Sequence, residues 1–252
     1  MGRVQLTIAY HGAAYCGWQV QPGLPTIQGT LQAALAAIEG APVHLTASGR
    51  TDTGVHALAQ SAHFDTTRPH SADTWRMALN AHLPPDIAVL AAHRVPDAFH
   101  ARYSAIGKHY RYRVLSRNAR CPFRRDRCWF VPRALDVDAM RRAAAHLLGR
   151  HDFTSLRAGD CAAASPVRTI TRLDVRPEAD EIVFDVEGEG FLKQMVRNIT
   201  GTLVHVGQGR RPPEWIPQML AGRHRAHAGE TAPAWGLALV AVHYPPHFGI
   251  GA

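Results

Sequence analysis

Residues 47–58, ASGRTDTGVHAL, combine a charged pair with residues that favour tight turns. Arg50 stands two residues before Asp52, which is flanked by threonines and followed by Gly54. If a strand continues to Arg50, both side chains point to one side, and the arginine favours the ionised form of the carboxylate. An ionised carboxylate that faces outward from a rigid turn suits a nucleophile. The same residues also fit an Asx-turn, in which the aspartate only hydrogen-bonds its own backbone.

Tyr110 and Arg197 are further candidates for chemistry. Tyr110 lies two residues before Tyr112 in GKHYRYRV, and a tyrosine among basic residues can stack on a base or move a proton. The alternative is that both tyrosines are core aromatics, which is the interpretation we keep for Tyr112. Arg197 is bracketed by apolar residues in FLKQMVRNITG, so it needs a partner such as the Asp52 carboxylate or a phosphate. Helical spacing places Lys193 and Arg197 on one face.

The charge of the chain is basic and unevenly distributed. Its 252 residues contain 28 Lys+Arg and 20 Asp+Glu, for a net charge of +8. Ten basic residues lie between Arg102 and Arg133, against a single acid, Asp126. A charge run is usually a solvated face, but a run this one-sided favours a polyanionic partner.

The sequence shows no pattern typical of a membrane span, a secretion signal, a cysteine motif or a metal site. No apolar run approaches the ~20 residues that span a membrane, and the N-terminus lacks the apolar core of a signal peptide, so we expect a cytoplasmic protein. The four cysteines form no Cys-x-x-Cys pair. The sixteen histidines are scattered without a completing set of ligands, so no metal site is predicted.

Residues 1–102 have the periodicity of a β-α-β-β-α-β unit. Alternating apolar residues indicate the strands, and Thr26 and Ser71 are the expected N-caps of the helices. The predicted elements are strand 3–9, helix 26–40, strands 43–48 and 57–65, helix 71–83 and strand 87–95.

Residues 103–252 repeat this order, with an added short helix. The predicted elements are strand 106–115, helix 136–148, a hairpin of strands 167–176 and 181–187, helices 191–206 and 213–221, and strand 235–244. We therefore predict an α+β protein of two ferredoxin-like (RRM-like) halves, 1–102 and 103–252, with a basic cleft between them.

Several segments together resemble one known family. GRTDTGVHALAQ resembles the signature of the pseudouridine synthases, in which the aspartate is catalytic. The other blocks resemble the tRNA pseudouridine(38-40) synthases, the TruA branch: these are YHGAAYCGWQVQP, FHARYSA, KHYRYRV, HDFTSL and GFLKQMVRNITG. The resemblance extends from about residue 6 to residue 244.

The resemblance implies an isomerase that acts on the anticodon arm of tRNA, as a homodimer and without a cofactor. It implies that Asp52 is the nucleophile and that Tyr110 packs on the target uracil and helps to remove its C5 proton. It further implies that Arg50 helps to eject the base and that Arg197 pairs with the catalytic carboxylate. Whether the carboxylate attacks ribose C1′ or uracil C6 stays open.

Two other function classes share part of this pattern. Aspartic proteases also contain Asp-Thr-Gly, but they need two such aspartates sharing a proton, and this chain has one. A non-catalytic RNA-binding module would share the charge and the fold. The Arg50–Asp52 turn argues against a module, because a bare carboxylate repels phosphate.

Overall fold

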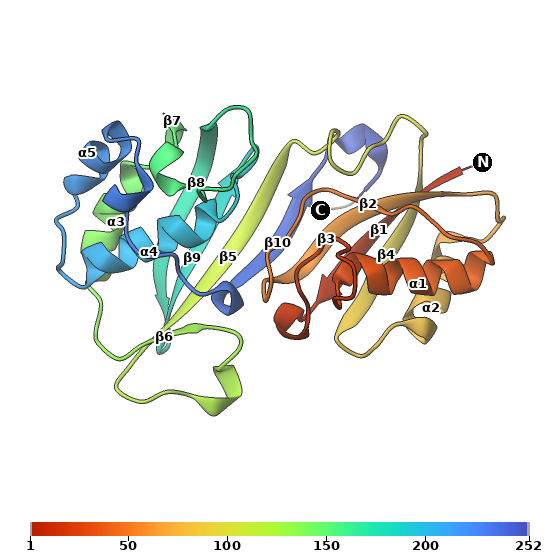
Figure 1. Cartoon of the computed structure of the whole chain (residues 1–252), viewed down its shortest axis with the longest axis horizontal. Helices are drawn as coiled ribbons and strands as arrows, with labels where there is room; N and C mark the ends of the chain where they lie inside the picture. The colour runs from red at the N-terminus through yellow and green to blue at the C-terminus, as the bar shows by residue number, and fades with distance from the viewer. Residues whose placement is uncertain (1, 251–252) are drawn as a thin grey trace. The chain divides into compact units, whose positions relative to one another are not determined.

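The computed structural model describes residues 2–250 and forms two compact units (Figure 1). The first unit contains the residues up to Lys108 together with those from Ala238 onward, and the second contains His109–Leu237. Both units combine helices with a β-sheet, which confirms the predicted α+β class. The sequence pattern divides the chain differently, between residues 102 and 103, and assigns the last strand to the second half.

The first unit contains the predicted β-α-β-β-α-β order followed by a strand from the far end of the chain. Its elements are β1 (Gly2–Tyr10), α1 (Ile27–Glu39), β2 (Thr46–Ala47), β3 (His56–Thr66), α2 (Ala72–His82), β4 (Ile87–Val95) and β10 (Leu237–His243).

Strand β3 organises the sheet of the first unit. It pairs antiparallel with β1, which in turn pairs antiparallel with β4. Its opposite edge is shared: His63 and Ala62 pair with β2, whereas His56 and Ala57 pair with Ala238 and Leu239 of β10. The turn that carries Asp52 therefore leaves the short β2 and enters β3 at the point where β10 holds it.

Local sequence accounts for the two helices of this unit. The side chain of Thr26 caps the N-terminus of α1 by accepting from Gly29 N, and Gly40 ends the helix in the left-handed conformation. Ser71 caps α2 in the same way, by accepting from Thr74 N. On the sheet, Val4, Leu6 and Ile8 alternate along β1 and are completely buried, as a half-buried strand requires.

The second unit forms a sheet in the order β5-β9-β8-β7, with β6 added parallel to β5. Its elements are β5 (Gly107–Ser116), β6 (Trp129–Val131), α3 (Val137–Ala145), β7 (Gly149–Asp152), β8 (Val167–Glu178), β9 (Glu181–Gly188), α4 (Met195–Gly207) and α5 (Trp215–Ala221).

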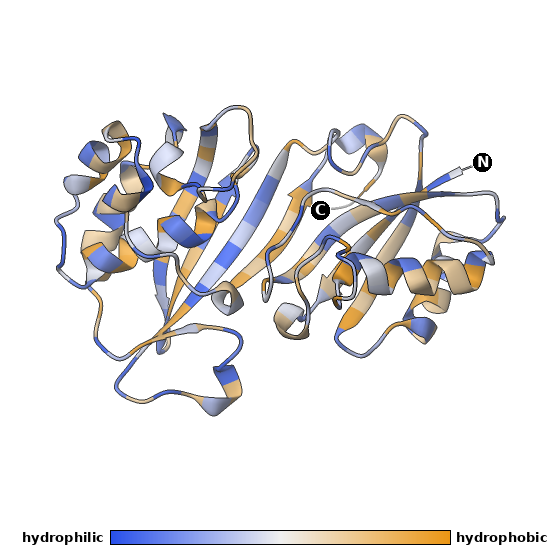
Figure 2. Ribbon diagram, viewed as in Figure 1, coloured by the Kyte–Doolittle hydropathy of each residue, from blue (hydrophilic) through white to orange (hydrophobic). Residues whose placement is uncertain are grey.

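Strongly hydrophilic residues alternate with less hydrophilic ones along β5, as the blue and pale positions of its ribbon in Figure 2 show. Tyr112 and Val114 are completely buried, whereas Arg111 and Arg113 are half-exposed. Phe184 and Val186 of β9 are core residues that flank Asp185. One face of the sheet is thus apolar and the other is charged.

Three predicted elements differ from the structure by three or more residues at one end. Strand 43–48 shortens to Thr46–Ala47, and helix 136–148 ends at Ala145 because β7 begins at Gly149. Helix 191–206 begins only at Met195, since Gln194 adopts a left-handed φ of 61° as its N-cap. Lys193 therefore precedes the helix, and the prediction that it shares a helical face with Arg197 is wrong. Strands β6 and β7 were not predicted.

Candidate active site

Asp52 lies on a tight turn between β2 and β3. Val55 N donates to Asp52 O at 3.1 Å, which closes the turn, and Gly54 supplies its left-handed residue, with a φ of 79°. Asp52 is half-buried, whereas Arg50 is exposed. The predicted placement of Asp52 on a Gly-containing turn between two strands is confirmed.

A buried glutamine fixes the start of this turn. Gln60 of β3 is completely buried, and its Oε1 accepts from Ser48 Oγ at 2.7 Å. Its Nε2 donates to Gly49 O at 3.0 Å. One side chain thus satisfies a hydroxyl and a carbonyl of the turn, so the chain three to four residues before Asp52 is held in place.

The loop after β1 holds the middle of the turn. Trp18 N donates to Thr51 O at 3.0 Å, and the hydroxyls of Tyr10 and Thr51 lie 2.8 Å apart. Burial raises the pKa of Tyr10 to about 12, so its hydroxyl stays protonated near neutral pH. Gly17 has a φ of 84°, and a Cβ there would lie 2.7 Å from Thr51 O. This close approach explains why glycine occupies position 17.

Lys108 contributes a charge beside the turn that sequence spacing did not reveal. Its Nζ donates to Ser48 O at 2.8 Å, and a Cβ on Gly49 would lie 2.6 Å from the same nitrogen. Burial, and next the positive charge of Arg102, lower the pKa of Lys108 from 10.5 to about 8. The first unit therefore places a desolvated ammonium group against the backbone that leads to Asp52.

The expected ion pair between Arg50 and Asp52 is absent. Within residues 2–250, the Arg50 guanidinium makes no hydrogen bond or ion pair. The reason is that β2 ends at Ala47, so the two-residue alternation of a strand does not extend to positions 50 and 52. Arg50 is instead exposed to solvent and available to an anionic group.

Tyr110 belongs to the second unit and lies at the margin of its core. Its side chain is 9% exposed, and its ring meets Phe191 edge-on at a centroid distance of 5.2 Å. Tyr112 is fully buried and donates its hydroxyl to Pro233 O at 2.7 Å. The interpretation of Tyr112 as a core aromatic is confirmed.

Arg197 lies in the first turns of α4, also in the second unit, and is half-buried. Its Nε donates to Ala232 O at 2.8 Å, and Ala232 N donates back to Arg197 O at 3.2 Å. A Cβ on Gly201 would lie 1.8 Å from Glu230 O, so the segment around Ala232 rests directly on the helix. This packing orients the guanidinium.

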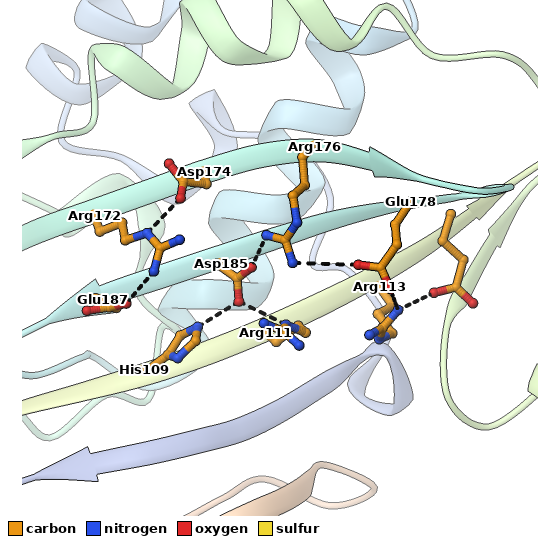
Figure 3. A network of polar contacts seen from close by, with 10 residues as sticks. His109, Arg111, Arg113, Arg172, Asp174, Arg176, Glu178, Asp185 and Glu187 are labelled. Carbon is orange, nitrogen blue, oxygen red and sulfur yellow. Dashed lines mark hydrogen bonds and ion pairs between the residues drawn. The ribbon is translucent and has the colours of Figure 1, made fainter. Parts of the chain in front are cut away.

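The charged face of the second sheet carries a network that the sequence did not reveal (Figure 3). Asp185 is 1% exposed and accepts from Arg176, from Arg111 Nε at 2.9 Å and from His109 Nε2 at 2.6 Å. Burial alone would raise the pKa of this carboxyl, but the hydrogen bonds from Arg176, Arg111 and His109 lower it to about 2. The carboxylate therefore stays ionised at all ordinary pH values.

This network changes the interpretation of the basic run between residues 102 and 133. Arg113 pairs with Glu181 at 2.7 Å, and Arg124 pairs with Asp180 at 2.6 Å. The β8–β9 hairpin thus supplies acids that neutralise part of the run, although they follow it by about 55–75 residues. Only the basic residues of this run that have no acidic partner are available to bind a polyanion.

The described residues 2–250 contain no cluster of three or more His, Cys, Asp or Glu side chains that could hold a metal ion. Across the same residues, none of the helices is long and apolar enough to cross a membrane.

Comparisons with known proteins are consistent with one family. The family model described as tRNA pseudouridine synthase matches residues 6–104 and 143–245. Proteins named tRNA pseudouridine synthase A are 51% identical in Myxococcus xanthus (97% of this chain, 92% of the relative) and 47% identical in Rhodopseudomonas palustris (97% and 99%). The relative of that name from Halalkalibacterium halodurans is 49% identical, over 94% of this chain and 90% of its own length. From its sequence matches over nearly the whole length, this chain belongs to the tRNA pseudouridine synthase family, whose members are isomerases.

Proposed function

We propose that this protein converts uridine to pseudouridine at positions 38–40, in the anticodon stem-loop of tRNA, with Asp52 as the nucleophile. The observation that carries the proposal is the immobilised turn, which presents a half-buried aspartate within the family's signature segment. Preorganisation of this kind favours catalysis, because a group already in position need not be ordered during the reaction.

The reaction is an isomerisation and needs no co-reactant. The bond between uracil N1 and ribose C1′ breaks, the base turns, and a bond forms between C5 and C1′. The proton on C5 is lost and N1 gains one, so the atoms balance. Asp52 forms a covalent bond with the nucleoside in the course of this exchange, at C1′ or at C6.

Three other side chains serve the same uridine in this proposal. Arg50, exposed and without a protein partner in residues 2–250, assists ejection of the base. Tyr110, edge-on to Phe191, packs on the uracil and takes part in removal of the C5 proton. Arg197, oriented by Ala232 O, balances the charge of the catalytic carboxylate. A paired base must leave its stack before these groups can reach it.

The same proposal includes a homodimer in the cytoplasm that uses no metal or organic cofactor. The support for the location is the substrate class, since tRNA is handled there. Analytical ultracentrifugation of the purified chain at several concentrations tests the dimer, and a single species of about 28 kDa would reject it.

The decisive experiment uses an unmodified tRNA transcript with uridines on the 3′ side of its anticodon arm. The protein is incubated with it in EDTA without nucleotides, and pseudouridine is mapped by chemical labelling and primer extension. We expect product at positions 38–40 with the native chain and with Asp73→Ala, a control at an exposed aspartate of the same unit. Asp52→Ala should give no product while its affinity for tRNA stays within a few-fold.

Two outcomes would contradict this proposal. Unchanged turnover by Asp52→Ala would exclude Asp52 as the nucleophile. Binding of several tRNAs without any modified base, together with tighter binding by Asp52→Asn, would favour the non-catalytic RNA-binding module.

A further inference from the structure

The connection between β5 and β6 is longer than a surface turn and has an unusual composition. The two strands are parallel, so the chain must return along β5, and residues 117–128 make this return. Parallel pairing explains the length of the segment, since it needs a connection of about a dozen residues. It does not explain five arginines against one aspartate, or the hydrophilic residues that predominate along the segment in Figure 2. We call residues 117–128 the return loop.

One side of the return loop is fastened to the β8–β9 hairpin. Arg117 Nη1 pairs with Asp180 at 3.0 Å, and Arg124 Nη1 pairs with Asp180 at 2.6 Å and with Glu181 at 3.0 Å. At the far end of the loop, the Sγ of the buried Cys128 donates to Arg124 O at 3.3 Å. These contacts hold the backbone of the loop at its beginning, middle and end.

The return loop also carries an exposed aromatic ring and exposed arginines that have no ion pair within residues 2–250. Phe123 lies in a short 3-10 helix, Pro122–Arg124, and is 92% exposed. Within residues 2–250 no other ring packs on it. Arg120, Arg125 and Arg127 are also exposed, and their guanidinium groups have no ion pair in the same residues. A single exposed apolar side chain is ordinary, but an exposed ring within four positions of three exposed arginines along the chain is a combination suited to nucleic acid.

We propose that the return loop is an additional RNA-binding element, in which Arg120, Arg125 and Arg127 bind phosphates of tRNA and Phe123 stacks on an unpaired base. The identity of the RNA as tRNA rests on the proposed function. The match to the family model adds nothing about this element, because that model covers residues 6–104 and 143–245 and leaves out the loop between them. The exposed residues of the loop are therefore what indicates an RNA-binding role.

Charge decides between RNA and a second copy of the same loop. The loop has a net charge of +4, so two copies would repel each other. A tRNA backbone has the opposite charge, and arginine matches phosphate with two parallel hydrogen bonds. The planar face of Phe123 adds stacking that any base can provide.

The test measures binding of a fluorescently labelled, full-length tRNA transcript by anisotropy at several KCl concentrations. Phe123→Ala should weaken binding by roughly 5- to 150-fold, the range for losing one stacked base. Phe123→Trp should bind as the native chain does. Phe123→Leu should lose affinity as alanine does, because leucine keeps an apolar side chain but no ring. Thermal unfolding is the control for folding. Because position 123 is exposed, each variant should unfold at the same midpoint temperature as the native chain.

The arginines are tested against a matched pair elsewhere in the same unit. Arg125→Gln with Arg127→Gln should make the plot of log affinity against log salt shallower by about 1.5 to 2, because two phosphate contacts are lost. Arg142→Gln with Arg150→Gln removes the same charge from exposed positions outside the loop and should leave this slope nearly unchanged.

Two results would overturn the inference. One is that Phe123→Ala and the Arg125/Arg127 variant bind tRNA within two-fold of the Arg142/Arg150 variant at every salt concentration. The other is that Phe123→Ala alters the sedimentation coefficient but not tRNA affinity, which would make the loop a subunit contact. Pseudouridine mapping with the native chain separates this inference from the proposed function. If the native chain forms product but the loop variants bind tRNA as it does, only the role of the loop is rejected. If the loop variants bind tRNA more weakly but the native chain forms no product, only the isomerase activity is rejected.

Discussion

The ammonium group of Lys108 donates a 2.8 Å hydrogen bond to the carbonyl oxygen of Ser48, two residues before Arg50. Sixty positions separate the two residues in the chain, yet the bond fixes the backbone where the catalytic turn of the proposed reaction begins. Because the same ammonium is desolvated, the bond also makes this part of the protein sensitive to pH.

Lys108→Met should remove a pH dependence from the stability of the native chain. The pKa of Lys108 is about 8 in the folded protein and 10.5 without perturbation, so the unfolded chain binds more protons between these values. Stability gained from this residue therefore rises with pH through that window, by about 3 kcal/mol in total. Urea unfolding at closely spaced pH values, native against Lys108→Met, measures the difference.

Arg102→Ala provides the control for this prediction. Removal of the second cause of the lowered pKa should raise the lower limit of this window and leave its upper limit at pH 10.5. A stability difference between native and Lys108→Met that stays constant from pH 8 to 10.5 would show that Lys108 titrates as an ordinary surface lysine.

Gly17→Ala should destabilise the protein more than Gly23→Ala does. Both glycines have positive φ values, 84° and 72°, so each alanine is strained by about 1 kcal/mol. Only at position 17 would the new Cβ also press on Thr51 O, at 2.7 Å, whereas position 23 is open. Thermal unfolding measures the stability of the two variants. Equal losses of stability would mean that the loop around position 17 can move away from Thr51 at no cost.

Gln60→Leu should destabilise the first unit and slow the proposed reaction. The change leaves Ser48 Oγ and Gly49 O without their buried partner, at a cost of about 1–3 kcal/mol for each group. Gln32→Leu, which removes one hydrogen bond from a half-exposed side chain, should cost less. Urea unfolding and single-turnover product formation are the measurements, and a Gln60→Leu chain of native stability and rate would contradict the assigned role.

Asp185→Asn should destabilise the second unit by about 2–3 kcal/mol, since it removes the charge of the buried carboxylate that the half-exposed Arg111 and Arg176 share. The carboxyl has a pKa of about 2 in the folded chain against 3.8 ordinarily, so its stabilising effect is complete above pH 4. The gap between native and variant should therefore narrow as pH falls from 4 to 2. Asp174→Asn, at an exposed ion pair, should cost less than about 1 kcal/mol. Acid titration followed by circular dichroism tests both expectations.

Local signals in the sequence predicted most of the elements. The caps at Thr26 and Ser71 act within three residues of themselves, so the sequence alone is enough to place them. The start of α4 was misplaced because its apolar periodicity extends back to residue 191, and nothing local indicates the left-handed Gln194. Strand β7 has four residues, too few for a pattern.

Long-range partners explain what could not be predicted at the site. The Asp52 turn was located from its own residues, but Lys108 and Gln60 reach it through the fold. In the sequence, Arg111 and Arg113 of β5 have no acidic residue nearby, because their partners Asp185 and Glu181 lie in a hairpin far along the chain. Spacing in sequence carries no information about which strands become neighbours.

The strand β10 also constrains how the protein is made. It belongs to the first unit and pairs with His56 and Ala57, next to the Asp52 turn, yet it is synthesised after the entire second unit. During synthesis on the ribosome, the start of β3 therefore lacks its β10 partner until the chain has emerged beyond residue 239. An exposed edge of this kind can recruit other strands. We expect slow translation of the second unit to increase aggregation of nascent chains, and a version permuted to start at β10 to relieve it.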